Sequence, residues 1–256
     1  MEHSNKSAAF GLGLTIFIFL AVLTGLEFFV AVALDAVPIL VAIALVKGGL
    51  VLYYYMHISK LNVKDENEDH KSYAYKTGSN RLGLWLFLLS DSFVFSGLLV
   101  SRFNLLGLTR PHLNQYLGLT VTVVLLISSF FMNRAEISME NGDRKSFLTN
   151  TLVTIILGAS FVAGVIGVEW RLAAAEGVTA SANAGGAIFY MMTGMHAFHV
   201  LTGVIFLSIV FNNARRGVYS AEKHWGVEAA TVYWHFVDVV WIFFYPALYL
   251  IGTLAK

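Results

Sequence analysis

Ionisable side chains within long apolar segments are the residues of this sequence that are best placed to do chemistry. Asp91 lies in one such segment, about 15 Å from its start at the rise of an α-helix. His196 and His199 lie one helical turn apart in a second segment. His235 and Asp238 lie one turn apart in a third. An ionised group costs about 2.5–3.5 kcal/mol at the bilayer centre, so each of these groups needs a partner, a water-filled cavity or a function.

The spacing of the two histidines raises the question of a metal or haem site. Imidazoles at i and i+3 could both reach one ion, and His235 with Asp238 on another helix could complete the ligand set. A membrane di-iron centre, however, needs a larger set of histidine and carboxylate ligands, and a haem pair usually comes from facing helices. We therefore favour hydrogen-bonded interior groups between helices, with lipid-headgroup and proton-pathway roles left open. We predict no metal site in this chain.

The segment around the two histidines also predicts close helix packing. Met192, His196, His199 and Gly203 follow the i, i+4, i+7, i+11 spacing that places side chains on one face of a helix. Small residues such as Gly194 and Gly203 let a neighbouring helix approach closely in a membrane. We expect this face to be paired with another helix.

The first two apolar segments carry a pair of opposite charges. Lys47 lies near the middle of its segment, and Glu27 lies in the outer third of its own. A lysine stem can extend along apolar surface by several ångströms and so reach a carboxylate at another depth. We predict an intramembrane ion pair between Glu27 and Lys47.

The elements that must position these residues follow from composition. Of the 256 residues, 57% are hydrophobic and 13% are charged, against about 25% charged residues in a soluble domain. A spanning helix needs about 20 mostly apolar residues. Seven segments qualify: 9–32, 37–59, 81–103, 115–132, 148–170, 186–211 and 229–253. They lack the alternation of barrel strands, so we predict an all-α polytopic membrane protein with seven transmembrane helices.

The distribution of charge predicts the orientation. With a cytoplasmic N-terminus, 12 lysines and arginines lie on the cytoplasmic side and 4 lie on the opposite side. We therefore place the N-terminus in the cytoplasm and the C-terminus outside. The N-terminal residues lack the pattern of a signal peptide, and we expect none. The 17 basic and 16 acidic residues nearly cancel, which indicates no nucleic-acid partner, and the absence of cysteine excludes disulfides and thiolate ligands.

A charged stretch divides the predicted helices into two and five. The run KDENEDHK lies between the second and third apolar segments, and such runs are usually solvated loops. We divide the chain into a two-helix hairpin (1–62), a charged cytoplasmic linker (63–80) and a five-helix bundle (81–256).

Four strings in the five-helix part are recognisable together. They are AATVYWHFVDVVWIFFYPALYL (229–250), YMMTGMHAFHVLTGVIFL (190–207), RLGLWLFLLSDSFVFSGLLVSRF (81–103) and GVEWRL (167–172). In this order they resemble subunit III of the haem-copper cytochrome c oxidases. That family generally carries a glutamate where this chain has Asp91, so a carboxylate is kept with a shorter reach.

The two-helix part carries a different string. KGGLVLYYYMHISKLN (47–62) resembles the second helix of the small prokaryotic oxidase subunit IV, which starts at a lysine and ends in a Met-His pair at the cytoplasmic surface. This resemblance implies a fusion of subunit IV with subunit III. The alternative is that both helices are simply the first two of a seven-helix subunit III.

The resemblance implies an accessory subunit of a proton-pumping oxygen reductase in a bacterial plasma (inner) membrane. Such a subunit carries no haem or copper itself, packs against the catalytic subunit I with subunit II in the same complex, and binds phospholipid. It supports proton uptake while the haem and copper of its partners reduce oxygen. The electron donor, cytochrome c or quinol, and membership of a respiratory supercomplex stay open. The residues expected to serve lipid binding or proton uptake are Asp91, Glu169, His196, His199, His235 and Asp238.

Other functions fit parts of this pattern. A relative of subunit III associated with nitric oxide reductase would carry the same strings. A proton-coupled transporter would also use buried carboxylates and histidines. Transporters usually have broken helices, however, and Pro38, Pro111 and Pro246 all lie towards helix ends.

Overall fold

Long apolar segments fold into helices in lipid because a helix satisfies its own backbone hydrogen bonds. The computed structural model describes residues 2–34, 36–59 and 73–254, with side chains from residue 6 onward in the first range and up to residue 253 in the last. Within these ranges, seven helices are long and apolar enough to cross a membrane. The predicted fold class is therefore confirmed.

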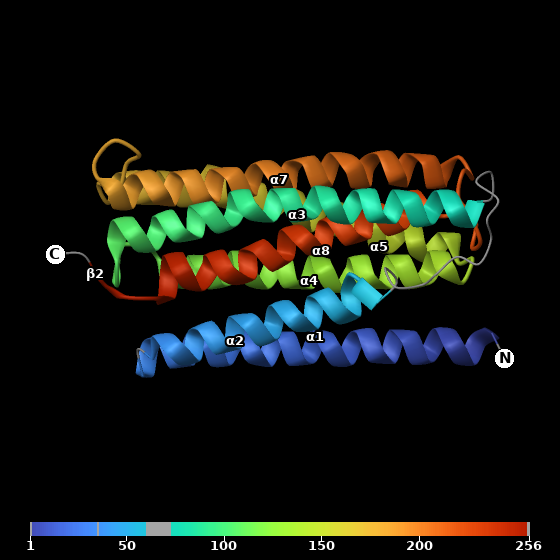
Figure 1. Cartoon of the computed structure of the whole chain (residues 1–256), viewed down its shortest axis with the longest axis horizontal. Helices are drawn as coiled ribbons and strands as arrows, with labels where there is room; N and C mark the ends of the chain where they lie inside the picture. Colours follow the sequence, from blue (N-terminus) through green and yellow to red (C-terminus); the bar gives the residue numbers. More distant parts are fainter. Residues whose placement is uncertain (1, 35, 60–72, 255–256) are drawn as a thin grey trace.

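Successive spans run in opposite directions along one bundle (Figure 1). The helical elements are α1 (Glu2–Ala33), α2 (Val37–Leu50), η1 (Val51–Tyr55), α3 (Tyr73–Leu106), α4 (Gln115–Glu140), α5 (Arg144–Val162), η3 (Ala163–Glu169), α6 (Trp170–Ala175), α7 (Ala184–Arg215), α8 (Trp225–Tyr245) and η4 (Pro246–Leu250). We name the two ends of the bundle by one residue each. The Lys6 end is where α1 begins, and the Arg102 end is where α3 ends.

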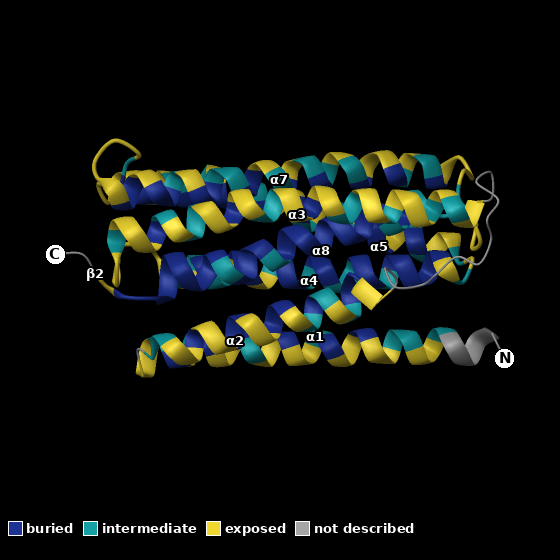
Figure 2. Ribbon diagram, in the orientation of Figure 1, coloured by how far each residue is buried: buried dark blue, intermediate teal, exposed yellow. Residues whose placement is uncertain are grey.

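The central helix of the bundle is α8. Its ribbon is dark blue along most of its length in Figure 2, and 89% of its most apolar stretch is buried, against 11% for α3. It contacts α2, α3, α4, α7 and η1. The outer helices keep exposed apolar side chains, such as Phe19 of α1 and Phe93 of α3. Polar side chains of α8 therefore have to find their partners within the chain.

Short polar residues begin several of the helices. Asn114, Asp143 and Asn183 precede α4, α5 and α7, and the side chain of each accepts a backbone N–H of the first turn. These bonds satisfy donors that a helix cannot satisfy itself. Pro38 lies in the first turn of α2, where its missing N–H costs nothing.

Three segments among the described residues are π-helical, with one extra residue per turn. They are η1 at the end of the second span, η3 near the end of the fifth and η4 at the end of the seventh. A π-helical turn shifts the side chains that follow it around the axis and is common at functional sites. Each of these segments contributes one buried polar side chain, namely Tyr55, Glu169 and Tyr249.

Arg102 joins the helix ends at one side of the membrane. Its side chain is fully buried. Nε donates to Ala247 O at 2.6 Å, and Nη1 donates to Gly107 O at 2.8 Å. Nη2 donates to Thr109 O at 2.8 Å and to Ile251 O at 3.0 Å. These carbonyls lie beyond the last turns of two helices, where a cation is favoured and the helix offers no donor.

Two very short strands continue this junction. β1 (Thr109–Arg110) pairs in parallel with β2 (Thr253–Leu254), so that Thr109 lies opposite Thr253. Gly252 precedes the pair at φ +103°, and a Cβ there would collide with the backbone of Leu108. Glycine is thus required for the end of the chain to lie against the α3–α4 connection.

Several helices extend beyond the apolar segments that predicted them. α3 begins at Tyr73, so residues 73–80 of the predicted linker form its first turns. Residues 63–72 of that linker lie outside the described residues. α4 continues to Glu140, past the predicted end at residue 132. Helical turns outside the hydrocarbon need no apolar composition, which explains why hydropathy underestimates their length.

The indole ring of Trp234 fills a gap that two glycines create beside α8. Trp234 is buried, and its Nε1 donates to Ser128 Oγ at 3.2 Å. A Cβ on Gly203 of α7 would lie 2.9 Å from Cε3 of the indole ring. Gly158 of α5 faces the ring from the other side. Gly203, on the face of α7 that carries the two histidines, thus leaves room for a bulky side chain of the central helix.

We predict that Gly203→Ala lowers the stability of the protein by about 1–3 kcal/mol, because an added methyl group overfills a well-packed site. Thermal unfolding in detergent measures the effect. Gly97→Ala is the matched control, since a Cβ there would meet no atom within 4 Å in the described structure. Equal unfolding temperatures for the two variants would contradict this account of the packing.

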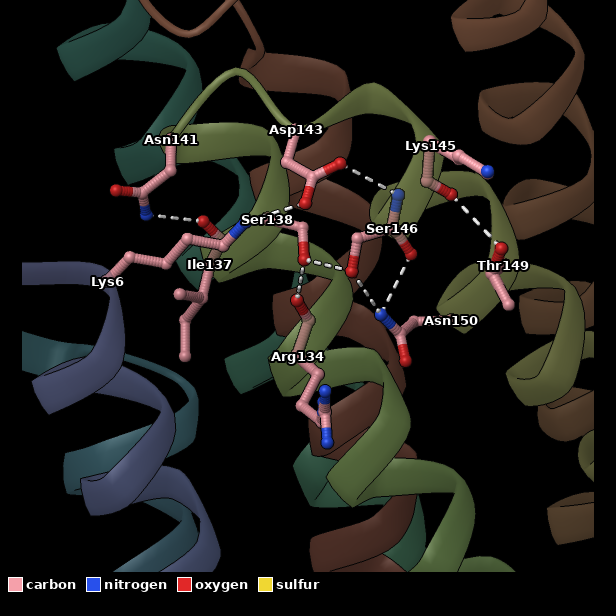
Figure 3. A network of polar contacts seen from close by, with 10 residues as sticks. All are labelled: Lys6, Arg134, Ile137, Ser138, Asn141, Asp143, Lys145, Ser146, Thr149 and Asn150. Carbon is pink, nitrogen blue, oxygen red and sulfur yellow. Dashed lines mark hydrogen bonds and ion pairs between the residues drawn. The ribbon is translucent and has the colours of Figure 1, made fainter. Parts of the chain in front are cut away.

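A polar network holds the turn between α4 and α5 at the Lys6 end (Figure 3). Asp143 accepts a hydrogen bond from Ser146 N at 3.0 Å. Lys6 Nζ, which comes from α1, donates to Asp143 Oδ2 at 2.6 Å. The hydroxyl oxygens of Ser138 and Ser146 lie 3.0 Å apart beside them. The network therefore ties the first helix to the α4–α5 turn.

The Lys6 side chain holds the pKa of Asp143 below its ordinary value, chiefly by its hydrogen bond, and the Ser146 N–H adds to the effect while burial opposes it. A carboxyl group whose pKa is lower in the folded state stabilises the fold above its unfolded pKa, about 3.9, and loses that contribution as the pH falls through the folded pKa. Asp143→Asn keeps an acceptor that can cap α5 but removes the charge.

We predict that Asp143→Asn lowers the unfolding temperature at pH 7, and that the difference from wild type shrinks as the pH falls below about 4. High salt should shrink the difference in the same way, because the pair is partly exposed. Unfolding curves across pH in detergent check both expectations. A difference that stays constant across this range would show that the Asp143 charge contributes nothing.

Candidate functional site

Asp91 and His199 form a pair between α3 and α7. His199 Nε2 lies 3.4 Å from Asp91 Oδ2, and both side chains are partly exposed. The other ring nitrogen, Nδ1, lies 2.8 Å from Met195 O. Because a carbonyl only accepts, Nδ1 carries a proton, and Nε2 faces the carboxyl group. The Nε2 atom of the imidazole and a carboxyl oxygen therefore face each other between α3 and α7.

Two hydroxyl groups extend this pair to the central helix. Thr202 Oγ1 lies 2.7 Å from Tyr233 Oη, and Thr202 also donates to His199 O at 2.9 Å. A cavity of about 390 Å³ opens over these groups. Its lining residues come from α3, α7 and α8 and are Leu84, Phe87, Asp91, Phe198, His199, Thr202, Phe206 and Tyr233. The site combines an apolar groove with a few polar groups at one edge.

His196 lies away from this groove in an aromatic cage. Its ring lies 4.7 Å from the Trp241 ring, tilted by 31°, and meets the edges of Phe161 and Phe244. The side chain is fully buried, and neither ring nitrogen has a hydrogen-bond partner among the described residues. His196 and His199 thus serve different surroundings although they lie one turn apart.

His235 and Asp238 are linked through a serine of α4. Ser129 Oγ donates to Asp238 Oδ2, so it accepts from the Nδ1 of His235, which lies 3.2 Å away. The ring of Tyr55 in η1 lies 4.9 Å from the His235 ring. All four side chains are buried. The arrangement is a hydrogen-bonded chain from an imidazole to a carboxyl group.

Glu169 lies apart from the other expected residues, towards the Arg102 end. Tyr249 Oη donates to Glu169 Oε1, and both side chains are buried. A cavity of about 10 Å³, room for about one water molecule, lies beside Glu169. Asn114 and Glu176 also line this cavity.

The two charges of the first two spans meet inside the bundle. Lys47 Nζ donates to Glu27 Oε2 at 2.7 Å. Their side chains are 2% and 0% exposed, so water solvates neither of them from the surface. The second oxygen of Glu27 has no hydrogen-bond partner among the described residues. The pair joins α1 to α2 at a depth where an unpaired charge would be strongly unfavourable.

The structure distributes the six expected site residues over four places. It brings Asp91 to His199 and His235 to Asp238, whereas Glu169 and His196 lie in separate surroundings. In the part of the chain that the structure describes, no three histidine, cysteine, aspartate or glutamate side chains gather as metal ligands.

The sequence did not point to the hydroxyl groups that connect these places. Ser129, Thr202, Tyr233 and Tyr249 each bond to an expected residue or to its neighbour. Serine, threonine and tyrosine are common in membrane helices, so their type carries little information. The sequence offered one hint for Tyr249, because it lies in the same apolar segment as His235 and Asp238.

Comparison with known proteins identifies a family whose sequences are similar to this chain. The sequence profile of the family described as "Cytochrome c oxidase subunit III" matches residues 3–253. A "Cytochrome c oxidase subunit 3" of Thermostichus vulcanus is 32% identical over 177 residues, which are 66% of this chain and 86% of that protein. Proteins of the same name from Synechocystis sp. and Podospora anserina are 33% and 34% identical, over 66% and 72% of this chain and 74% and 71% of their own lengths.

We predict that Glu27→Gln or Lys47→Met alone strongly reduces the yield of folded protein, because removal of one partner of a buried pair costs about 3–5 kcal/mol. The double variant should recover most of the loss, since it leaves no unpaired charge. Yield from membranes and thermal unfolding measure both effects. Lys145→Met, at an exposed position, is the control for loss of a lysine. A double variant no better than either single one would show that the pair is not compensatory.

Proposed function

Because the chain belongs to the cytochrome c oxidase subunit III family, we propose that it is an accessory subunit of a proton-pumping haem-copper terminal oxidase. The observation that carries this proposal is the match of the family profile to residues 3–253, which include all seven spans. In this proposal the haem and copper belong to partner subunits I and II, and this chain packs against subunit I. The names of its relatives favour cytochrome c as the electron donor.

The Asp91–His199 pair supports a role in proton uptake. The pair brings a carboxyl group and an imidazole within 3.4 Å of each other, at the edge of a groove that opens from the bundle. A group of this kind can take up and release protons close to a partner's surface. In our proposal it delivers protons to the entry path of the catalytic subunit during oxygen reduction.

Grooves on the same side of the bundle support lipid binding. One is the cavity of about 390 Å³ beside Asp91. A second cavity, of about 130 Å³, lies between α3 and α8 and is lined by aromatic side chains that include Phe95, Phe236 and Phe243. Apolar grooves of this shape suit acyl chains, and we propose that phospholipid fills them in the complex.

The two-helix part and the orientation complete the proposal. α1 packs on α4, and α2 packs on α8, so that both helices belong to the bundle. The string at 47–62 favours an origin of these helices as a fused subunit IV. The excess of basic residues at the Lys6 end favours a cytoplasmic location for that end, in a bacterial plasma membrane.

We predict that Asp91→Ala shortens the active lifetime of the oxidase during turnover or slows its proton uptake, because His199 loses the carboxyl group that lies 3.4 Å from its Nε2. The haem content of the purified complex should stay unchanged. Oxygen consumption followed until inactivation, proton uptake kinetics and haem spectra of the same preparation measure these effects.

Two variants make this prediction specific. Asp91→Glu restores a carboxyl group and should retain most of the activity, whereas Ser101→Ala changes a half-buried residue of the same helix, away from Asp91, and should behave as wild type. Loss of haem in Asp91→Ala would instead indicate a role in assembly. Unchanged lifetime and proton uptake in Asp91→Ala would contradict the proposed role of the pair.

A further inference from the structure

The central helix carries its protonatable side chains along one stripe. His235, Asp238 and Tyr245 lie within about 80° of one another around the axis of α8, at about 100° per residue. Tyr249 follows one turn later in η4. From His235 to Tyr249 the stripe covers about 21 Å of a hydrocarbon core of about 30 Å. All four side chains are buried.

The stripe has one wide gap, and the first two helices fill it. Asp238 and Tyr245 are seven positions apart, about 10 Å along the axis. The Glu27–Lys47 pair lies beside this gap: Gly48, next to Lys47, faces the ring of Phe243 on α8, and Tyr55, eight positions further along the same span, lies beside His235. The pair is therefore in range of both sides of the gap. Without it, the polar groups of α8 would form two separate clusters.

Part of the path on either side of the pair is joined by hydrogen bonds. Towards the Lys6 end, Ser129 connects Asp238 to His235. Towards the Arg102 end, Tyr249 donates to Glu169, and its ring lies 5.7 Å from that of Tyr245 without a hydrogen bond between their hydroxyl groups. The small cavity beside Glu169 has room for about one water molecule.

Unsatisfied atoms mark the remaining gaps. Oε1 of Glu27, Oη of Tyr245, Oε2 of Glu169 and Nε2 of His235 are buried and have no hydrogen-bond partner among the described residues. Buried polar atoms without a protein partner usually bind internal water. All four belong to the stripe or to the residues that flank it.

We propose that this stripe is a proton-transfer path along the interior of the bundle, which α1 and α2 complete by placing Glu27 and Lys47 between Asp238 and Tyr245. Each hydroxyl, carboxyl or imidazole group accepts one proton from one side and releases another to the next group, directly or through one water molecule. One proton enters at His235, and one leaves at Glu169, which is the direction in which Ser129 donates to Asp238 and Tyr249 donates to Glu169. No other reactant is consumed. All three π-helical segments in the described part of the chain contribute to the path, through Tyr55 beside His235, Glu169 and Tyr249.

Both ends of the path lie near the surface of the bundle. At the Arg102 end, the cavity beside Glu169 is also lined by Glu176, whose side chain is 44% exposed. At the Lys6 end, the ring of Tyr55 lies beside that of His235, and His57, two positions after Tyr55, has a side chain that is 32% exposed. The path does not include Asp91 and His199, and it does not depend on the proposed role in oxygen reduction.

The test is a measurement of passive proton flux. The complex that carries this chain is reconstituted into liposomes that contain a pH-sensitive dye, and a potassium gradient with valinomycin imposes a potential without any electron donor. Wild type is expected to show a flux above that of liposomes without protein. Tyr245→Phe, which removes only an oxygen with no hydrogen-bond partner among the described residues, should abolish that additional flux. Glu27→Gln should do the same where it folds.

The control is Tyr190→Phe, which removes a hydroxyl of α7 that donates to the backbone carbonyls of Trp170 and Val178 and not to a side chain of the stripe. It should keep the flux of wild type. A wild-type flux equal to that of empty liposomes, an unchanged flux in Tyr245→Phe, or an equal loss in Tyr190→Phe would each overturn the proposal. Oxygen consumption of the same vesicles reports on the oxidase function separately.

Discussion

The absence of water inside the bilayer is the constraint on which this structure depends. The central helix α8 is surrounded by other helices, so a polar group that it carries depends on another part of the chain or on internal water. Asp238 meets Ser129 of α4, and Tyr249, in η4 at the end of the same span, meets Glu169 of η3, whereas Tyr245 Oη has no hydrogen-bond partner among the described residues. The buried Arg102 solves the same problem at the end of the bundle, where four carbonyls have lost their helical donors. The order in which the helices pack follows from these contacts as much as from apolar surface.

The polar residues of α8 face two different surroundings. On one side Tyr233 reaches His199 and the groove beside Asp91, which opens towards lipid or a partner subunit. On the other side His235 and Asp238 are buried and face α4 and the first two helices. Proton exchange with a partner needs the open groove beside Asp91, because a proton must leave the chain. Proton movement along the bundle needs the buried side of α8, because exposure to lipid would interrupt it.

Much of this organisation could be predicted from the sequence, and there are physical reasons why the other features could not. Seven spans follow from hydropathy because the thickness of the hydrocarbon core sets their length. The Glu27 and Lys47 charges stand out because charge is rare at that depth. Ser129 and Tyr249 could not be found in this way, because a hydroxyl group has a small free-energy cost in a membrane helix and is therefore common there. Its role depends on which neighbouring side chain faces it. The start of α3 at Tyr73 was missed because a helix outside the hydrocarbon can be polar.

The buried ion pair explains why the first two helices are more than an addition to a five-helix bundle. A buried pair is often no more stabilising than apolar residues of similar volume, so helix adhesion alone gives no reason to keep two charges in a membrane. α1 and α2 also have ample apolar contact with α4 and α8. The charges are placed where the polar groups of α8 would otherwise be separated by about 10 Å. Their position fits a requirement for continuity of the polar stripe, whether the two helices arose by fusion or belong to the original subunit.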